Sequence, residues 1–195
     1  EGNKKNSIYV ELLKKIMLPR DLIIYPKEIS DIEVLVPEER KKVIKEELEE
    51  MREQYCALNR LFFDKSYPKS ALIEKYTAFI NLNPKYYAAY RDRAILYTHI
   101  GKYREAVADN QLLITHNERV WSDAIINKAE ALFFLKDYDE ALKVANHYFA
   151  ICEKPTAECY RIRAEIFRKL KMSDEYKADM RESKRLRKEE KNRIW

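Results

Sequence analysis

The chain repeats its own residue pattern at an interval of 35 residues, and this period strongly limits what it can fold into. A fixed period of about 20 to 50 residues is typical of proteins that stack one small structural unit several times. Three columns share the interval, each with one kind of side chain: large (Tyr90, Ile125, Tyr160), small (Ala94, Ala129, Ala164), and large and apolar (Tyr97, Leu132, Phe167). A weaker copy lies upstream, one residue closer, at Cys56, Arg60, Phe63, Lys69, Leu72 and Tyr76. The period therefore predicts four stacked repeats.

Each repeat is predicted to form two amphipathic helices joined by a tight corner. Gly101 is one of only two glycines in the chain, and glycine tolerates the left-handed backbone that is common just past a helix C-terminus. We therefore expect the first helix of this repeat to end there, and the second to run from about Arg104 to Thr115. Lys136 and Lys171 stand at the same position in the later copies, where left-handed geometry would cost about 1 kcal/mol each.

These columns resemble the tetratricopeptide repeat family. The family pattern of an aromatic, a small and an aromatic residue in helix A, followed by Ala in helix B, is met by Tyr90, Ala94, Tyr97 and Ala106. The last copy has Tyr176 where the family prefers Ala, so we expect its second helix to pack more loosely. The resemblance implies an all-α fold, a right-handed superhelical solenoid of antiparallel helix pairs. The repeats are expected at about residues 53–86, 87–121, 122–156 and 157–190, within a repeat domain of residues 53–195.

Residues 1–52 do not repeat, and we expect them to form an N-terminal appendage, partly helical and partly extended. Ser7–Leu18 predicts a short amphipathic helix, and Leu22–Val36 predicts an extended apolar segment that caps the first repeat. Solenoids need such caps for solubility. A further helix is expected to run unbroken from Glu38 to near Ser66.

Few residues in the chain are suited to catalysis or metal binding. With a single interior glycine, no phosphate-cradling loop is expected. His147, Cys152 and Cys159 match no zinc spacing and lack a fourth ligand, so buried thiols at helix interfaces are the better interpretation. A Cys–His nucleophilic pair is left open, and His99 and His116 are expected to be polar surface residues. We therefore expect a protein that is not an enzyme, with no cofactor, no metal and no small-molecule substrate.

The composition, 46% apolar and 36% charged, suits a folded helical chain. No apolar run approaches the roughly 18 to 20 residues of a membrane span, so none is expected. The odd number of cysteines weakly favours a reducing compartment, such as the cytoplasm. The sequence begins without Met at the polar stretch EGNKKNS. A cloning boundary and a processed, envelope-tethered protein both remain open.

The resemblance also implies a binding groove lined by the first helix of each repeat. The groove-facing columns hold an apolar centre rimmed by Arg and Glu, which suits an extended or helical peptide with apolar and charged groups. The candidate groove residues are Arg91, Ile95, Thr98, His99, Ile126, Asn127, Glu130, Phe133, Phe134, Arg161, Glu165, Arg168 and Lys169.

Three other kinds of binding were weighed against this groove. Some family members grip the C-terminal carboxylate of heat-shock chaperones, and Arg91 and Asn127 fit two of their positions. Ile95, Glu158 and Ile162 occupy the others, which removes the cationic side of that clamp, so this role is rejected. A secretion-type chaperone for an apolar client segment remains an alternative.

The third alternative is binding of an anionic surface or nucleic acid by the basic C-terminal helix. Residues 161–195 hold 13 Lys or Arg and 7 Asp or Glu, whereas the charges of residues 1–160 nearly balance. The acids lie at helical i,i+3 and i,i+4 distances from the bases, which favours a solvated, ion-paired helix. A protein or peptide partner is therefore preferred over nucleic acid.

Overall fold

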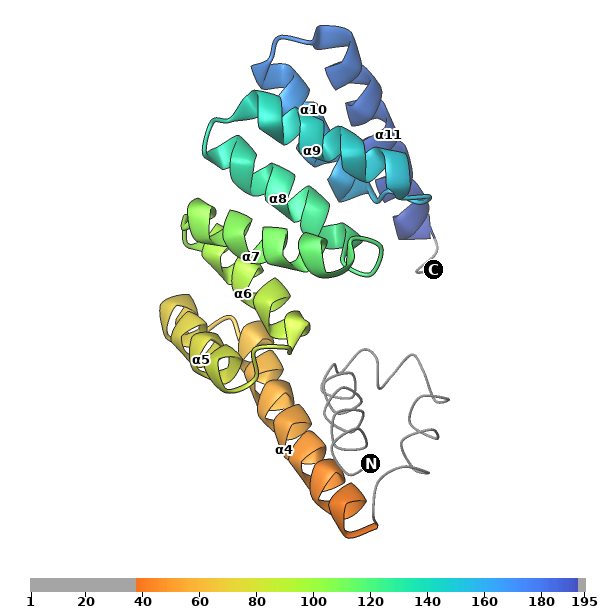
Figure 1. The fold of residues 1–195 in the computed structure, drawn as a ribbon. Helices are drawn as coiled ribbons and strands as arrows, with labels where there is room; N and C mark the ends of the chain where they lie inside the picture. The colour runs from red at the N-terminus through yellow and green to blue at the C-terminus, as the bar shows by residue number, and fades with distance from the viewer. Residues whose placement is uncertain (1–37, 193–195) are drawn as a thin grey trace, which may run out of the picture. The chain divides into compact units, whose positions relative to one another are not determined.

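A computed structural model describes residues 38–192 of the chain, with side chains from residue 45 onward. Within this range the chain forms α-helices and no strand, as the repeat pattern predicts (Figure 1). The expected helix at residues 7–18 and the extended segment at residues 22–36 lie outside the described residues. The described backbone divides into two compact units, with the boundary between Tyr90 and Arg91.

The first unit contains the long helix α4 (Glu38–Phe63), α5 (Lys69–Leu82) and the start of α6 (Tyr87–His99). The expected unbroken helix from Glu38 is present as α4. Its buried residues Met51, Tyr55 and Leu58 recur at helical spacing, and the ring centroid of Tyr55 lies 4.5 Å from that of Tyr86. Opposite them, α5 buries Leu72, Ile73, Tyr76, Phe79 and Ile80. The proposed domain boundary between residues 52 and 53 falls within α4 and stays a prediction.

The second unit contains the rest of α6 and five further helices in chain order. These are α7 (Tyr103–Asn117), α8 (Ser122–Phe134), α9 (Tyr138–Ile151), α10 (Ala157–Lys169) and α11 (Ser173–Asn192). Each helix from α7 to α11 packs against the next one in the sequence (Figure 1). Short connections between neighbours make the successive helices antiparallel, which is the arrangement expected for stacked helix pairs.

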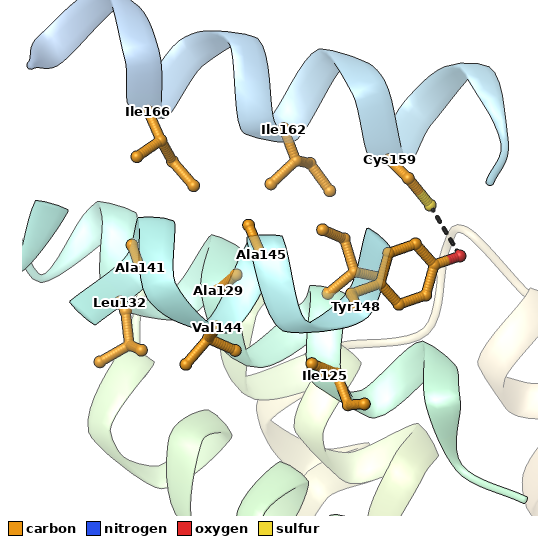
Figure 2. Close-up of a cluster of buried hydrophobic side chains, with 11 residues drawn as sticks. Ile125, Ala129, Leu132, Ala141, Val144, Ala145, Tyr148, Cys159, Ile162 and Ile166 are labelled. Carbon is orange, nitrogen blue, oxygen red and sulfur yellow. Dashed lines mark hydrogen bonds between the residues drawn. The ribbon is translucent and has the colours of Figure 1, made fainter. Parts of the chain in front are cut away.

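The core of the second unit lies between α8, α9 and α10, with α9 in the middle (Figure 2). Small residues let the helices approach closely: Ala129, Ala141 and Ala145 are fully buried. Larger residues fill the remaining space, listed in chain order as Ile125, Ile126, Leu132, Val144, Tyr148, Cys159, Ile162 and Ile166. The columns that carry the 35-residue period are therefore the residues that pack the helices together.

The corners of the last three repeats share one backbone geometry. Gly101, Lys136 and Lys171 have φ angles of 78°, 66° and 61°, all left-handed. After each, the next residue donates its backbone N–H to the carbonyl five residues earlier, at 2.9, 3.1 and 2.9 Å. This is the bond pattern of a Schellman cap. The expected left-handed corner is confirmed, and two lysines adopt a conformation that favours glycine.

Two ion pairs, each between a partly buried arginine and a buried aspartate, join the helices within their repeats, and the sequence interpretation did not anticipate them. Arg93 donates to both carboxylate oxygens of Asp109 at 2.8 Å. Arg163 does the same with Asp179 at 2.7 and 2.9 Å. The two pairs lie two repeat periods apart in sequence. This spacing was the sequence signal that could have predicted them. Each pair holds the first helix of its repeat to the second through a bidentate contact.

Candidate functional site

Four charged side chains from α8, α10 and α11 form a chain of ion pairs on the second unit. Arg161 Nε donates to Glu158 Oε1 at 2.8 Å, and Arg161 Nη2 lies 3.4 Å from Glu130 Oε1. Arg187 Nη2 of α11 donates to the other oxygen of Glu158 at 3.2 Å. Arg161, which was predicted to face a ligand, therefore already has two carboxylate partners.

The two acids beside Arg161 differ in their electrostatics. The hydrogen bond from Arg161 holds the pKa of Glu158 below its usual value. Burial raises the pKa of Glu130, and the nearby Arg161 charge offsets this only in part. Glu158 is consequently the firmer anion of the two and the main partner of Arg161.

The other predicted arginines are also paired with acids on their own helices. Arg168 Nε and Nη2 donate to Glu165 Oε2 at 2.9 and 2.6 Å. Arg91 Nε and Nη2 donate to Asp92 Oδ1 at 2.9 and 2.8 Å. A ligand carboxylate would have to compete with these intramolecular partners for the guanidinium groups.

Four aromatic side chains from α7, α8 and α9 form a continuous row, here called the aromatic row: Tyr103, Phe134, Phe133 and Tyr138. The rings of Tyr103 and Phe134 stack, with centroids 4.8 Å apart and planes at 12°. The ring of Phe133 meets that of Phe134 edge to face, with centroids 5.4 Å apart, and its centroid lies 5.7 Å from that of Tyr138. Phe134 is 44% exposed although it is a large apolar residue. The row therefore combines internal stacking with an apolar ring open to solvent.

Ile126 differs from the expectation of an exposed groove residue. Its side chain is only 4% exposed and belongs to the core cluster. Because α8 packs against α7, α9 and α10, it buries a wider face than a single apolar stripe would. Ile126 therefore supports the core and offers no surface to a partner.

The remaining predicted residues vary in exposure. Ile95, Thr98 and Asn127 are half-buried, and Thr98 Oγ1 donates to the Ala94 carbonyl at 3.1 Å. His99 is exposed, as is Lys169, which occupies the position of Phe134 in the next repeat. Among the predicted residues, the structure brings together Glu130 with Arg161, Phe133 with Phe134, and Glu165 with Arg168.

The sequence interpretation left Glu158, Tyr103 and Tyr138 out of the candidate groove. A signal for each was present: Glu158 lies three residues before Arg161, and the two tyrosines occupy one column of the repeat. Residues three apart on a helix are neighbours on its surface. That rule alone would have predicted the Glu158–Arg161 pair.

Two cysteines, Cys152 at the C-terminal end of α9 and Cys159 in α10, contact one hydroxyl group. Cys152 Sγ lies 3.2 Å from Tyr148 Oη, and Cys159 Sγ lies 3.2 Å from the same atom; Figure 2 shows the second of these bonds. Cys159 is buried in the core, as expected for an interface thiol. His147 pairs with a residue other than these thiols: its Nε2 lies 2.7 Å from Glu118 Oε1.

Within residues 45–192, no group of His, Cys, Asp or Glu side chains is arranged to hold a metal ion. No helix in the same range has the length and apolar character needed to cross a bilayer.

Comparison with known proteins gives a structural likeness and no sequence match. No protein-family model matches the chain, and no curated protein sequence does. One crystal structure of MamA has a TM-score of 0.60 at 19% identity, over 80% of this chain and 87% of that one. A second, of MamA protein, has a TM-score of 0.59 at 18% identity, over 99% of this chain and 96% of that one. The likeness shows the fold: the chain is an all-helical repeat protein of the solenoid class.

Proposed function

We propose that this protein is a non-enzymatic scaffold that binds a segment of a protein partner on the first helices of its repeats. The observation that carries the proposal is the exposed ring of Phe134 within the aromatic row. Aromatic side chains that keep an open face are frequent anchors of protein–protein interfaces. Phe134 is held in place by Tyr103 on one side and Phe133 on another, so little side-chain entropy is lost when a partner covers it.

The ion pairs on α10 favour a particular kind of partner segment. Arg161 and Arg168 are each bound to an acid of the same helix. A partner carboxylate would therefore gain little from them, in contrast to the expectation that these arginines grip a ligand. These paired charges, here called the polar rim, lie on α10 and, through Glu130, on α8, the helix that carries Phe133 and Phe134. The segment that fits is one that supplies a large apolar side chain to Phe134 and hydrogen-bonding groups to the rim.

A pull-down comparison tests whether Phe134 anchors a partner. The tagged chain and its Phe134→Ala variant are used to capture proteins from extracts of the source cells, and captured proteins are quantified by mass spectrometry. Overlapping peptides of any protein lost with Phe134→Ala are then titrated against both chains by fluorescence anisotropy. We expect Phe134→Ala to weaken peptide binding by about 1–3 kcal/mol, as for an interface hot spot.

Two matched variants control for loss of apolar surface and of charge. Ile151→Ala removes a side chain of similar exposure, 39%, from the end of α9, and Lys143→Glu reverses an exposed charge on the same helix. Both should bind normally. Equal weakening by Ile151→Ala, or normal binding by Phe134→Ala, would place recognition elsewhere on the chain.

One more variant, Lys169→Glu, tests the polar rim without disturbing its ion pairs. Lys169→Glu changes an exposed residue at the position that Phe134 holds in the preceding repeat. If the partner segment crosses both repeats, this reversal should also weaken binding. Arg161→Glu is less informative, because it would place a third acid beside Glu130 and Glu158.

A further inference from the structure

The exposed charges of α11 separate into two faces. Five basic residues recur at helical spacings of four and three and share one exposed face: Lys177, Arg181, Lys184, Lys188 and Lys191. No acidic residue of α11 interrupts this face, here called the α11 cationic stripe. Asp174, at its N-terminal edge, is the nearest acid, with Oδ1 3.7 Å from Lys177 Nζ.

Two acids of α11, Glu182 and Glu189, pair on another flank of the helix. Arg185 donates to Glu182, and its Nη1 donates to Glu189 at 2.5 Å. The seven acids of residues 161–195, these two among them, were expected to neutralise much of the positive charge of that segment. Glu182 and Glu189 instead pair with Arg185, which lies outside the stripe. Lys184, Lys188 and Lys191 make no ion pair with the described residues 45–192.

The packing of α11 on α10 keeps the stripe turned outward. Asp179 is buried against α10 by its bidentate contact with Arg163. The buried hydroxyl of Ser183 donates to the carbonyl of Ala157 at 2.7 Å. These contacts fix the rotation of α11 about its own axis. The stripe spans 15 residues, from 177 to 191, or about 21 Å at a rise of 1.5 Å per residue.

We propose that the α11 cationic stripe binds the surface of a bilayer that contains anionic phospholipids. A straight row of exposed charges can approach a planar anionic surface with all members at once. Four of its five residues are lysines, which act as mobile point charges rather than as bidentate clamps. The stripe has no apolar side chain, so binding is electrostatic and peripheral, without insertion.

The same chemistry disfavours nucleic acid as the occupant. The stripe holds no aromatic residue on which bases could stack. It also holds no amide or hydroxyl side chain that could read base edges. The phosphates of a nucleic acid would be attracted to the lysines, but no side chain of the stripe would recognise its bases. The proposal is separate from partner binding at Phe134, and either can fail without the other.

Vesicle sedimentation tests the proposal with the full chain. The probes are vesicles of phosphatidylcholine alone and vesicles in which one third of the lipid is phosphatidylglycerol. We expect binding to the anionic vesicles only, and loss of binding as salt is raised, because salt screens the surface potential. Each basic residue near such a surface raises the affinity about fivefold. Lys184→Gln with Lys188→Gln should therefore weaken binding about 25-fold.

The control removes the same number of charges elsewhere. Lys143→Gln with Lys154→Gln neutralises two exposed lysines outside α11 and should leave vesicle binding unchanged. Circular dichroism confirms that both double variants fold. The proposal is overturned if the chain does not bind anionic vesicles, if it binds neutral vesicles equally, or if the control weakens binding as much as the stripe variant. Tighter binding to duplex DNA at equal phosphate concentration would assign the stripe to nucleic acid instead.

Discussion

The left-handed lysines at two repeat corners lead to a quantitative prediction about stability. Lys136→Gly and Lys171→Gly should each raise the free energy of unfolding. Both residues have positive φ, 66° and 61°, and both side chains are exposed. Glycine adopts this backbone without steric cost, and it keeps the N–H that caps the preceding helix.

The expected gain follows from two opposing contributions. Left-handed geometry costs a residue with a Cβ about 1–2 kcal/mol. Glycine increases the entropy of the unfolded chain, which offsets about 0.4–1 kcal/mol. We therefore expect a net stabilisation of about 0.5–1 kcal/mol for each substitution. The two changes lie in different repeats, so the double variant should gain about twice as much.

Urea denaturation followed by far-UV circular dichroism measures the effect. For a chain of this length, 1 kcal/mol corresponds to a shift in Tm of about 2–4 °C. A single transition with an unchanged slope is needed, because repeat proteins can unfold in parts. The double variant gives the clearest result, since its expected gain exceeds the error of the extrapolation.

Two controls separate backbone strain from other effects of glycine. Gly101→Ala should lower the free energy of unfolding by about 1 kcal/mol. The nearest atom to a Cβ at this residue, Tyr103 Oη, is 4.0 Å away, so there is room for the methyl group. The cost therefore comes from the positive φ angle alone. Lys154→Gly changes an exposed loop lysine whose φ is not positive and should be slightly destabilising. If Lys136→Gly lowers stability as Lys154→Gly does, the reasoning about strain is refuted.

Three further predictions concern the buried and ion-paired groups. Asp179→Ala leaves Arg163 without its carboxylate and should cost about 3–5 kcal/mol in urea denaturation. Tyr148→Phe removes the hydroxyl that meets both thiols and should cost about 1 kcal/mol in the same assay. The pKa of Glu158 is lowered in the folded chain by Arg161, so its contribution is present above the unfolded pKa and is lost as the pH falls through the folded value. Glu158→Gln should therefore reduce the loss of stability between neutral and acid pH.

Each of these predictions has an outcome that would contradict it. Glu182→Ala removes an exposed partner of Arg185 and should cost well under 1 kcal/mol. An equal cost for Asp179→Ala would show that the buried pair is no more important than the exposed one. A stabilising Tyr148→Phe would mean that the hydroxyl is poorly satisfied. A wild-type pH profile for Glu158→Gln would assign the acid sensitivity to other carboxyl groups.

Sequence alone determined the architecture of this protein, because the repeat period depends on local packing rules. Ala129 must be small where two helices approach, and Leu132 must be large where they leave space. Such requirements recur at every repeat and so appear as a period. The corner at Gly101 could also be predicted from the sequence, since few residues tolerate a left-handed backbone. Lys136 and Lys171 stand one and two periods later, so the same corner was expected there.

The surface was decided by the tertiary structure. Whether Ile126 is exposed depends on how many helices contact α8, and the sequence of α8 does not state this. Arg161 was expected to be available to a ligand, but its partner Glu130 comes from another helix, 31 positions away. The acids of α11 were counted against all its bases, whereas the rotation of α11 on α10 buries Asp179 against Arg163 and leaves Glu182 and Glu189 beside Arg185, outside the stripe. Charge pairing depends on side-chain positions across helices, and only the folded chain fixes those positions.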